Sequence, residues 1–293
     1  MYTMRPGEFT YHRPTSVEEA ISLIGGDARP LAGGHSLLPM MKIRLAAPAA
    51  LVDLGRIPGL DEISRDGDTL RIGGTATHAA VAASDVVRSA CPVLAEAAGG
   101  IGDRQVRNRG TIGGSIAHAD PGADYPTVLT ALGATIAVAG SRGEREVAID
   151  DFFQGVFTTA LGPDELVTAV QVPVTSAGTG AAYAKKAHPA SGYAVAGAAA
   201  VVSVEGGSCT AARIAIGGVT GTPVRATAAE QVLVGEVVSL EAATRAADTV
   251  ARSLGSGEIG DTYASAEYRV HLATVLAKRA LAAAIERSGA GGS

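Results

Sequence analysis

The first 57 residues alternate between short apolar runs and one amphipathic segment. Apolar residues at positions 17, 20, 21 and 24 keep helical spacing, and the glycine pair at 25–26 favours the end of a helix there. Thr15 or Ser16 can cap its first turn. Short apolar runs predict strands at 9–11, 30–32 and 51–54. We therefore expect a small α/β unit over residues 1–57.

A larger α/β unit is predicted over residues 58–177. Its pattern of apolar positions indicates strands and helices in mixed order. The expected strands are 70–74, 134–138, 145–148 and 166–172, and the expected helices are 77–90, 92–98 and 127–132. Glycine and threonine cluster at 178–180, after Pro173, so this stretch is a candidate linker to the next part of the chain.

The last part, residues 178–286, is predicted to combine an antiparallel sheet with a helical bundle. Strands at 194–204 and 209–216 flank Gly206-Gly207, which suits a hairpin turn. Helices are expected at 227–234, 240–253 and 265–286, and glycine and serine in 287–293 indicate a flexible tail. The predicted fold class is therefore α+β, with a two-part N-terminal region followed by this C-terminal domain.

Composition narrows the class of protein. Hydrophobic residues make up 47% of the chain and charged residues 18%, which favours a packed core over disorder. A net charge of −5 argues against a nucleic-acid partner. No apolar stretch is long enough for a membrane span, and the amino terminus does not resemble a signal peptide.

Metal and disulfide chemistry also find little support in the sequence. The two cysteines, Cys91 and Cys209, lie far apart, which is typical of a reducing compartment, and two thiols cannot ligate an iron–sulfur cluster. The six histidines lack the spacing of a zinc site, so no metal is expected in this chain. Rossmann, Walker and Gly-x-Ser-x-Gly motifs are absent from the sequence as well.

Two glycine loops carry the clearest functional signal. The stretches Leu31-Ala32-Gly33-Gly34-His35-Ser36 and Thr111-Ile112-Gly113-Gly114-Ser115 each combine an apolar run, a glycine pair and a small hydroxyl residue. Paired glycines leave no Cβ to hold a ligand away, so successive N–H groups can converge on a phosphate. Either motif alone is more often an ordinary turn, but the pair predicts that both loops grip the diphosphate of one dinucleotide.

With their flanks, these loops resemble the FAD-binding medium subunit of the molybdenum hydroxylases. The flanks are Leu37-Leu38-Pro39-Met40 and Arg107-Asn108-Arg109-Gly110, and the likeness continues in Tyr183-Ala184-Lys185 and Ser265-Ala266-Glu267-Tyr268-Arg269. The stretch 188–194, His-Pro-Ala-Ser-Gly-Tyr-Ala, is most similar to the carbon monoxide dehydrogenase branch. The resemblance covers nearly the whole chain. It implies a two-part FAD-binding domain, with the C-terminal domain closing over a non-covalently bound FAD.

The resemblance also assigns cofactor contacts to both loops and to later positions. These are Ala32, Gly33, Gly34, His35, Ser36, Leu37, Ile101, Thr111, Ile112, Gly113, Gly114, Ser115, Asp124, Val167, Lys185 and Tyr193.

Three of these residues carry specific expectations from the resemblance. Asp124 is expected on a hydroxyl of the sugar or ribityl part, Lys185 as a positive charge near the flavin, and Tyr193 over its ring. Taken apart from the resemblance, Asp124 is interpreted as an acidic residue of a turn, Lys185 as a solvated surface amine, and Tyr193 as a core residue at the start of a strand. Asp120, on the same Pro-Gly turn as Asp124, is not included.

By the same resemblance, the chain is one subunit of a complex and has no catalytic acid or base of its own. A large molybdenum-cofactor subunit would oxidise the substrate, and a small subunit with [2Fe–2S] clusters would relay electrons to FAD on this chain. Quinone or another acceptor would then take them. The molybdenum pterin and the clusters are expected only on the partners, in a cytoplasmic dimer of heterotrimers that touches the membrane only peripherally.

Three alternatives stay open from the sequence. The chain can serve an aldehyde or N-heterocycle dehydrogenase of the same family, whose flavin subunits are close kin. A stand-alone FAD oxidase is a different class, in which the flavin is bonded covalently to His35 of the Gly-Gly-His loop. A flavin-free scaffold subunit is the third.

Overall fold

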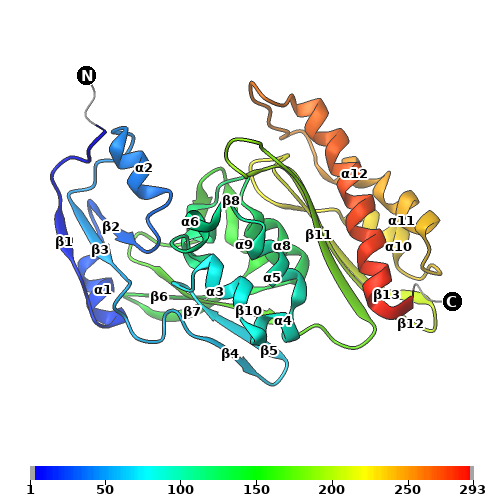
Figure 1. The fold of residues 1–293 in the computed structure, drawn as a ribbon, viewed down its shortest axis with the longest axis horizontal. Helices are drawn as coiled ribbons and strands as arrows, with labels where there is room; N and C mark the ends of the chain where they lie inside the picture. The colour runs from blue at the N-terminus through cyan, green and yellow to red at the C-terminus, as the bar shows by residue number, and fades with distance from the viewer. Residues whose placement is uncertain (1–3, 291–293) are drawn as a thin grey trace.

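The computed structural model describes residues 4–290 as three neighbouring regions, each built on its own sheet. Figure 1 shows the N-terminal sheet at the left, the larger middle region beside it, and the C-terminal sheet with its helices at the right. Each of these sheets takes its strands from one of the predicted stretches 1–57, 58–177 and 178–286. The α+β class is confirmed, while the domain borders stay a prediction.

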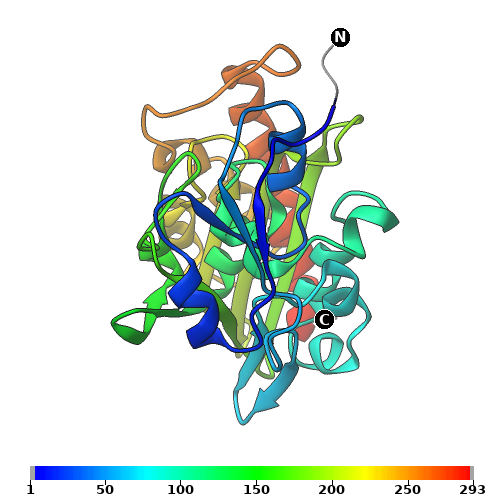
Figure 2. The same cartoon turned by 90° about the vertical axis from the view of Figure 1, so that its left-hand side faces the viewer.

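The N-terminal region is a parallel three-stranded sheet with two short helices (Figure 2). Ser16 caps the first helix, as expected, because its hydroxyl accepts a hydrogen bond from Glu19 N. The second helix was not expected from the sequence and directly continues the first glycine loop. In chain order the elements are β1 (Thr10–His12), α1 (Val17–Leu23), β2 (Ala28–Leu31), α2 (Leu37–Lys42) and β3 (Ala50–Asp53).

The middle region is an antiparallel sheet of order β4-β5-β10-β6-β7, covered by helices. Its strands are β4 (Ile63–Asp66), β5 (Thr69–Gly73), β6 (Thr135–Gly140), β7 (Gly143–Ala148) and β10 (Leu166–Pro173), with β8 (Phe153–Gly155) and β9 (Thr158–Thr159) forming a small hairpin. Its helices are α3 (His78–Ala83), α4 (Asp85–Ala90), α5 (Pro92–Gly99), α6 (Arg104–Arg107), α7 (Ile112–His118), α8 (Asp124–Leu132) and α9 (Ile149–Phe152).

One expectation for this region is corrected. The helix predicted at 77–90 is two helices, because Ser84 has an extended backbone and its hydroxyl caps α4 through Val87 N. The second glycine loop forms the first turn of α7, with Thr111 as its cap.

The C-terminal region is an antiparallel sheet of order β11-β12-β13-β14 with helices on one side. The stretch 178–180, expected as a linker, instead begins the first strand, where Thr179 pairs with Ser203. The elements are β11 (Thr179–Ala187), β12 (Ala194–Glu205), β13 (Ser208–Gly217), β14 (Val224–Arg225), α10 (Thr227–Leu233), α11 (Leu240–Ala247), the 3-10 turn Val250–Ser253 and α12 (Ala266–Ile285).

The flexible tail predicted over residues 287–293 is wrong for its first four residues, 287–290. Residues Glu286–Ala290 continue α12 as an irregular helical turn, and Arg287 donates hydrogen bonds to Glu96 (2.9 Å) and to the carbonyl of Ala181 (2.9 Å). These contacts tie the end of the chain back to α5 and β11. The remainder of the predicted tail, 291–293, lies outside the described residues.

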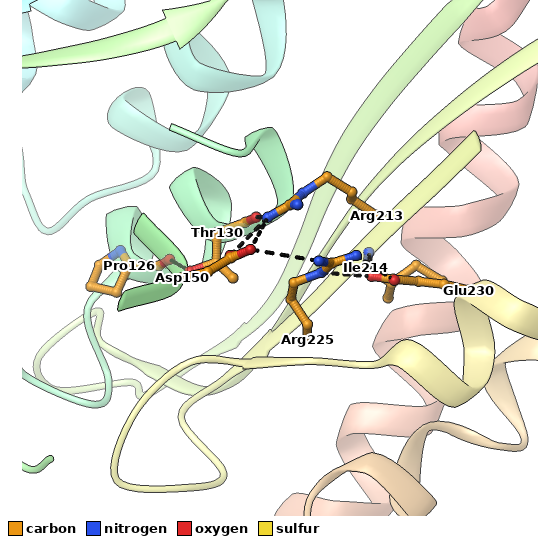
Figure 3. Close-up of polar contacts among 7 residues, drawn as sticks. All are labelled: Pro126, Thr130, Asp150, Arg213, Ile214, Arg225 and Glu230. Carbon is orange, nitrogen blue, oxygen red and sulfur yellow. Dashed lines mark hydrogen bonds and ion pairs between the residues drawn. The ribbon is translucent and has the colours of Figure 1, made fainter. Parts of the chain in front are cut away.

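The middle and C-terminal regions share an extensive interface. Helix α8 packs on β12 and β13, while α12 covers the opposite side of that sheet (Figure 1). Arg213 on β13 donates to the carbonyl of Thr130 (2.8 Å) and to both carboxylate oxygens of Asp150 (2.8 and 3.1 Å) (Figure 3). Arg225 lies 3.5 Å from the same carboxylate and also donates to Glu230 (2.6 Å). This charged network fastens α8 and α9 to the C-terminal sheet.

Candidate functional site

A cavity of about 910 Å³ lies where the two glycine loops meet the loop before β12. Its size falls within the range of about 300–1,000 Å³ that is typical of small-molecule and cofactor sites. Residues from all three regions line it. Of the predicted contacts, these line the cavity: Ala32, Gly33, Gly34, His35, Ser36, Leu37, Ile101, Thr111, Gly113, Gly114, Ser115, Asp124, Val167 and Tyr193.

The two glycine loops touch each other, as the sequence predicted. A Cβ on Gly33 would lie 2.1 Å from the carbonyl oxygen of Arg109, directly before the second loop. On the other side, a Cβ on Gly114 would lie 4.0 Å from the Cβ of Ala32. Backbone approach this close excludes any side chain at Gly33, so the glycine is required for the junction itself.

The first loop lines the cavity and has backbone N–H groups without an acceptor among the described residues. Gly34 takes a φ of 75°, which turns the chain into α2. Within residues 4–290, no protein group accepts a hydrogen bond from the backbone N–H of any residue from 33 to 37. Since such groups need an acceptor, consecutive free donors in a cavity wall fit an anionic ligand such as a diphosphate.

In the second loop the backbone N–H groups have partners inside the protein, and contact of this loop with a phosphate stays a prediction. The N–H groups of Ile112 and Gly113 donate to the carbonyls of Ala76 (3.0 Å) and Gly74 (2.9 Å). The Thr111 hydroxyl accepts from Gly114 N (3.1 Å), and its carbonyl accepts from Ser115 N (3.0 Å). All four N–H groups are therefore already used inside the protein. This loop offers a wall without bulky side chains, and the Ser115 hydroxyl, rather than an N–H nest.

Two predicted residues, Ile112 and Lys185, do not line the cavity. Ile112 is fully buried in the core of the middle region, behind the loop. Lys185 points to Asp124, as described below. Whether either residue contacts a cofactor stays a prediction.

His78, on α3, belongs to the cavity wall and carries no sequence motif that could have revealed it. It is buried, and its ring lies 5.3 Å from that of Tyr125. Burial, with smaller contributions from the nearby His35 and Arg107, lowers the pKa of His78 to about 4. The imidazole is therefore neutral at physiological pH. Its Nδ1 atom has no hydrogen-bond partner in the described part of the chain.

His35, in the first glycine loop, also lines the cavity. Its side chain is exposed, and its Nε2 atom lies 3.5 Å from the carbonyl oxygen of Gln105. The residue places an imidazole next to the free N–H groups of the first loop, where it can accompany an anion.

Asp124 is the first residue of α8 and forms a buried cluster with β11. Tyr183 donates to its Oδ1 atom (2.7 Å) and Lys185 to its Oδ2 atom (2.9 Å). Burial raises the pKa of Asp124, while the charge of Lys185 and the hydrogen bond from Tyr183 lower it. Both carboxylate oxygens already accept protein hydrogen bonds. The predicted contact of Asp124 with a ribityl or sugar hydroxyl stays a prediction.

Tyr193 brings the C-terminal region to the first glycine loop. Its side chain is 42% exposed and lies in the cavity wall. Burial and the charge of Asp120 raise the pKa of Tyr193, and the neighbouring Ser36 hydroxyl lowers it. Asp120 also lines the cavity, although the sequence left it out, and it accepts from Gly122 N (2.9 Å) to close the Pro-Gly turn.

The rim contains a further aromatic residue that sequence reasoning missed. Phe157, after β8, has a φ of 53°, is 57% exposed, and lines the cavity beside His118. The two rings lie 5.0 Å apart. A left-handed backbone at an exposed phenylalanine is uncommon and depends on local support, here a hydrogen bond from Phe157 N to the carbonyl of Ala119.

Metal ligation and membrane insertion find no support in residues 4–290. Over that range, no group of His, Cys, Asp and Glu side chains is placed to hold a metal ion. The helices described there are all too short or too polar to cross a bilayer.

Two known domain families match successive parts of the chain. Residues 7–175 match the FAD-binding domain in molybdopterin dehydrogenase, and residues 181–284 match the CO dehydrogenase flavoprotein C-terminal domain. The carbon monoxide dehydrogenase medium chain of Afipia carboxidovorans is 41% identical and covers 97% of this chain and 99% of its own length.

Solved structures agree with the sequence matches. Carbon monoxide dehydrogenase from Hydrogenophaga pseudoflava, which lacks the Mo-pyranopterin moiety, superposes with a TM-score of 0.92 at 44% identity, over 96% of this chain and 99% of that chain. Quinoline 2-oxidoreductase from Pseudomonas putida 86 gives a TM-score of 0.91 at 35% identity, over 97% and 99%.

Proposed function

This chain belongs to the FAD-binding family of molybdopterin dehydrogenase subunits, and from that premise we propose that it is the medium subunit of a carbon monoxide dehydrogenase. In this role it binds FAD and transfers electrons within an oxidoreductase complex. The observation that carries the assignment is the cavity where the two glycine loops meet, with the unpaired N–H groups of residues 33–37 in its wall.

The described residues fit FAD in a specific way. The free N–H groups of the first loop, with the Ser36 hydroxyl, bind the diphosphate. Apolar side chains such as Ile101 and Val167 exclude water from the walls. Tyr193 limits access to the cavity from the C-terminal side.

When bound, FAD supplies the redox chemistry, because it can accept electrons from one carrier and give them to another. The protein contributes binding, orientation and charge, and no acid or base of this chain acts on a substrate. Asp124 and His78 are therefore assigned to the architecture of the site rather than to proton transfer.

The partners follow from the same proposal. A large molybdenum-cofactor subunit would oxidise the substrate, a small subunit would carry [2Fe–2S] clusters, and quinone or another acceptor would take the electrons. The assembly is a dimer of heterotrimers in the cytoplasm, and the FAD is not covalently attached. The stand-alone oxidase and the flavin-free scaffold find no support among the relatives, which are subunits of dehydrogenase complexes.

The decisive experiment uses the purified complex. Acid precipitation should release all flavin into the supernatant, because no bond to His35 holds it. In a separate sample of the native complex under anaerobic conditions, carbon monoxide should bleach the flavin absorbance. Bleaching by an aldehyde or by quinoline, with no response to carbon monoxide, would instead assign the chain to a heterocycle or aldehyde dehydrogenase. Flavin retained in the protein pellet would support the covalent oxidase.

A further inference from the structure

Lys185 connects three segments that are far apart in the sequence. From β11, its Nζ atom donates to Asp124 Oδ2 (2.9 Å), to the carbonyl oxygen of Gly100 (2.9 Å) and to that of Gly192 (3.0 Å). Only 14% of its side chain is exposed, and 4% of that of Asp124. The ion pair therefore lies inside the protein, between the middle and C-terminal regions.

The ammonium group has no donor left for another ligand. A lysine ammonium carries three N–H bonds, and each has an acceptor here. Its charge is matched at close range by the Asp124 carboxylate. A direct contact from Lys185 to a bound flavin would require breaking one of these three hydrogen bonds and exposing a buried partner.

Both carbonyl acceptors sit one residue before a side chain of the cavity wall. Gly100 precedes Ile101, and Gly192 precedes Tyr193. Lys185 itself does not line the cavity. The Lys185 ammonium therefore fixes the backbone next to two residues of the cavity wall, Ile101 and Tyr193.

Other contacts make the loop before β12 dependent on this tether. Within the loop, His188 N donates to the carbonyl of Tyr193 (2.8 Å), and Gly192 N donates to that of His188 (2.9 Å). These bonds close the loop on itself but do not anchor it to the middle region. The anchors to that region are the Lys185 bridge and the bond from Ala194 N to the carbonyl of Gly122 (2.8 Å).

We propose that Lys185 is a positioning residue, whose Asp124-paired ammonium holds the loop that carries Tyr193 against the end of α5. This inference rests on the proposed function, because it concerns how Tyr193 is presented to FAD. In this role Lys185 acts on the cofactor through Tyr193, and not through its own charge. Tyr183 supports the arrangement by holding the second oxygen of Asp124.

The first test is amide hydrogen exchange in the purified complex, with and without FAD. Lys185→Met should speed exchange at Gly192 and Ala194 by about tenfold or more, because hydrogen bonds from a charged group are stronger than neutral ones and hold the loop closed. Lys186→Met removes the same charge from the exposed neighbour and should leave these rates unchanged. Unchanged rates in Lys185→Met overturn the proposal, and because the FAD-free sample is included, this result is independent of whether FAD binds.

The second test separates positioning from direct charge. The flavin midpoint potential is measured for Lys185→Met in the native background and again in a Tyr193→Ala background. If Lys185 acts through Tyr193, its removal shifts the potential in the first background and has no further effect in the second. A shift that persists without Tyr193 means that the lysine charge acts on the flavin directly, and overturns the proposal.

A double variant tests the tether without leaving an unpaired buried charge. Lys185→Met alone leaves the Asp124 carboxylate buried without its counter-ion, which is strongly destabilising. Asp124→Asn/Lys185→Met removes both charges together, and should fold while still losing the tether to Gly100 and Gly192. Fast exchange in the loop of this double variant supports the proposal, and native exchange contradicts it.

Discussion

His78 and Tyr125 lie against each other beside the cofactor cavity, with ring centres 5.3 Å apart and planes tilted by 57°. Both side chains are buried, and neither His78 Nδ1 nor the Tyr125 hydroxyl has a partner among the described residues. Buried polar atoms normally find a hydrogen bond, so this pair holds unused bonding capacity next to a ligand site. Burial of His78 keeps its imidazole neutral at physiological pH.

This burial predicts a specific dependence of stability on pH. The pKa of His78 is about 4 in the folded protein, against about 6.5 in an unfolded chain. Between these values the unfolded chain binds the proton and the folded protein does not. The contribution of neutral His78 to the free energy of unfolding is therefore fully present above about pH 6.5. About 3 kcal/mol of that free energy is lost as the pH falls toward 4.

Urea unfolding of the FAD-free protein between pH 4 and 7 measures the effect. A His78→Gln variant should lose stability less steeply than the native chain as the pH is lowered, because the titrating group is gone. If the free energy of unfolding falls equally steeply with pH in the two proteins, His78 accepts a proton in the folded state, contrary to its burial.

Replacement of Gly33 should separate the two glycine loops. In Gly33→Ala the new Cβ would meet the Arg109 carbonyl at 2.1 Å, so the backbone must move by more than an ångström before the variant can fold. We expect the FAD content of the purified complex, read from flavin absorbance per protein, to fall by about tenfold or more, as for the loss of roughly 1.4 kcal/mol or more of binding energy.

Gly257→Ala is the matched control for this variant. A Cβ there meets no atom of residues 4–290 within 4 Å, and the backbone is not in the left-handed region. Its flavin content should equal that of the native complex. Native flavin content in Gly33→Ala would mean that the junction of the loops does not form the cofactor site.

Loss of the hydroxyl group should lower stability at Thr111 and FAD affinity at Ser36. The Thr111 hydroxyl caps α7, whereas the described contacts give Ser36 no capping bond at α2. Thr111→Val should therefore cost about 1 kcal/mol of stability with little change in FAD affinity. Ser36→Ala should leave stability nearly unchanged and weaken FAD binding.

Chemical denaturation and flavin titration of the two variants check this contrast. A loss of FAD affinity in Thr111→Val without loss of stability would restore the second loop as a direct phosphate ligand.

Local pattern was enough to predict most elements and the junction of the loops. Helix α1, strands such as β10 and β12, and both glycine motifs depend on neighbouring residues, and the family resemblance is confirmed. Helix α2 escaped prediction because Pro39 lies within it, although proline is tolerated in a first turn.

What local pattern missed depends on tertiary contacts. The N–H of Gly113 is unavailable because it donates to the carbonyl of Gly74, the residue directly after β5. Lys185 finds its acceptors at residues 100, 124 and 192, which only the folded chain brings together. His78 reaches the cavity because α3 lies under the second loop, where its N–H donates to the carbonyl of Gly110 (2.9 Å). None of these three partnerships leaves a signal in a single sequence.

The charged network between the middle and C-terminal regions leads to the last prediction. Asp150 accepts from Arg213 and lies 3.5 Å from Arg225, so its removal leaves two arginines facing each other (Figure 3). Because these side chains are partly exposed, solvent screens the loss, and we expect Asp150→Ala to reduce the free energy of unfolding by about 1 kcal/mol. Asp151→Ala, at the exposed neighbouring position, is the control and should have little effect. Urea unfolding at low and high salt decides the point, since the difference between the two variants should shrink as salt rises. A difference that is absent at low salt would mean that packing of α8 on β12 and β13, and not this network, joins the regions.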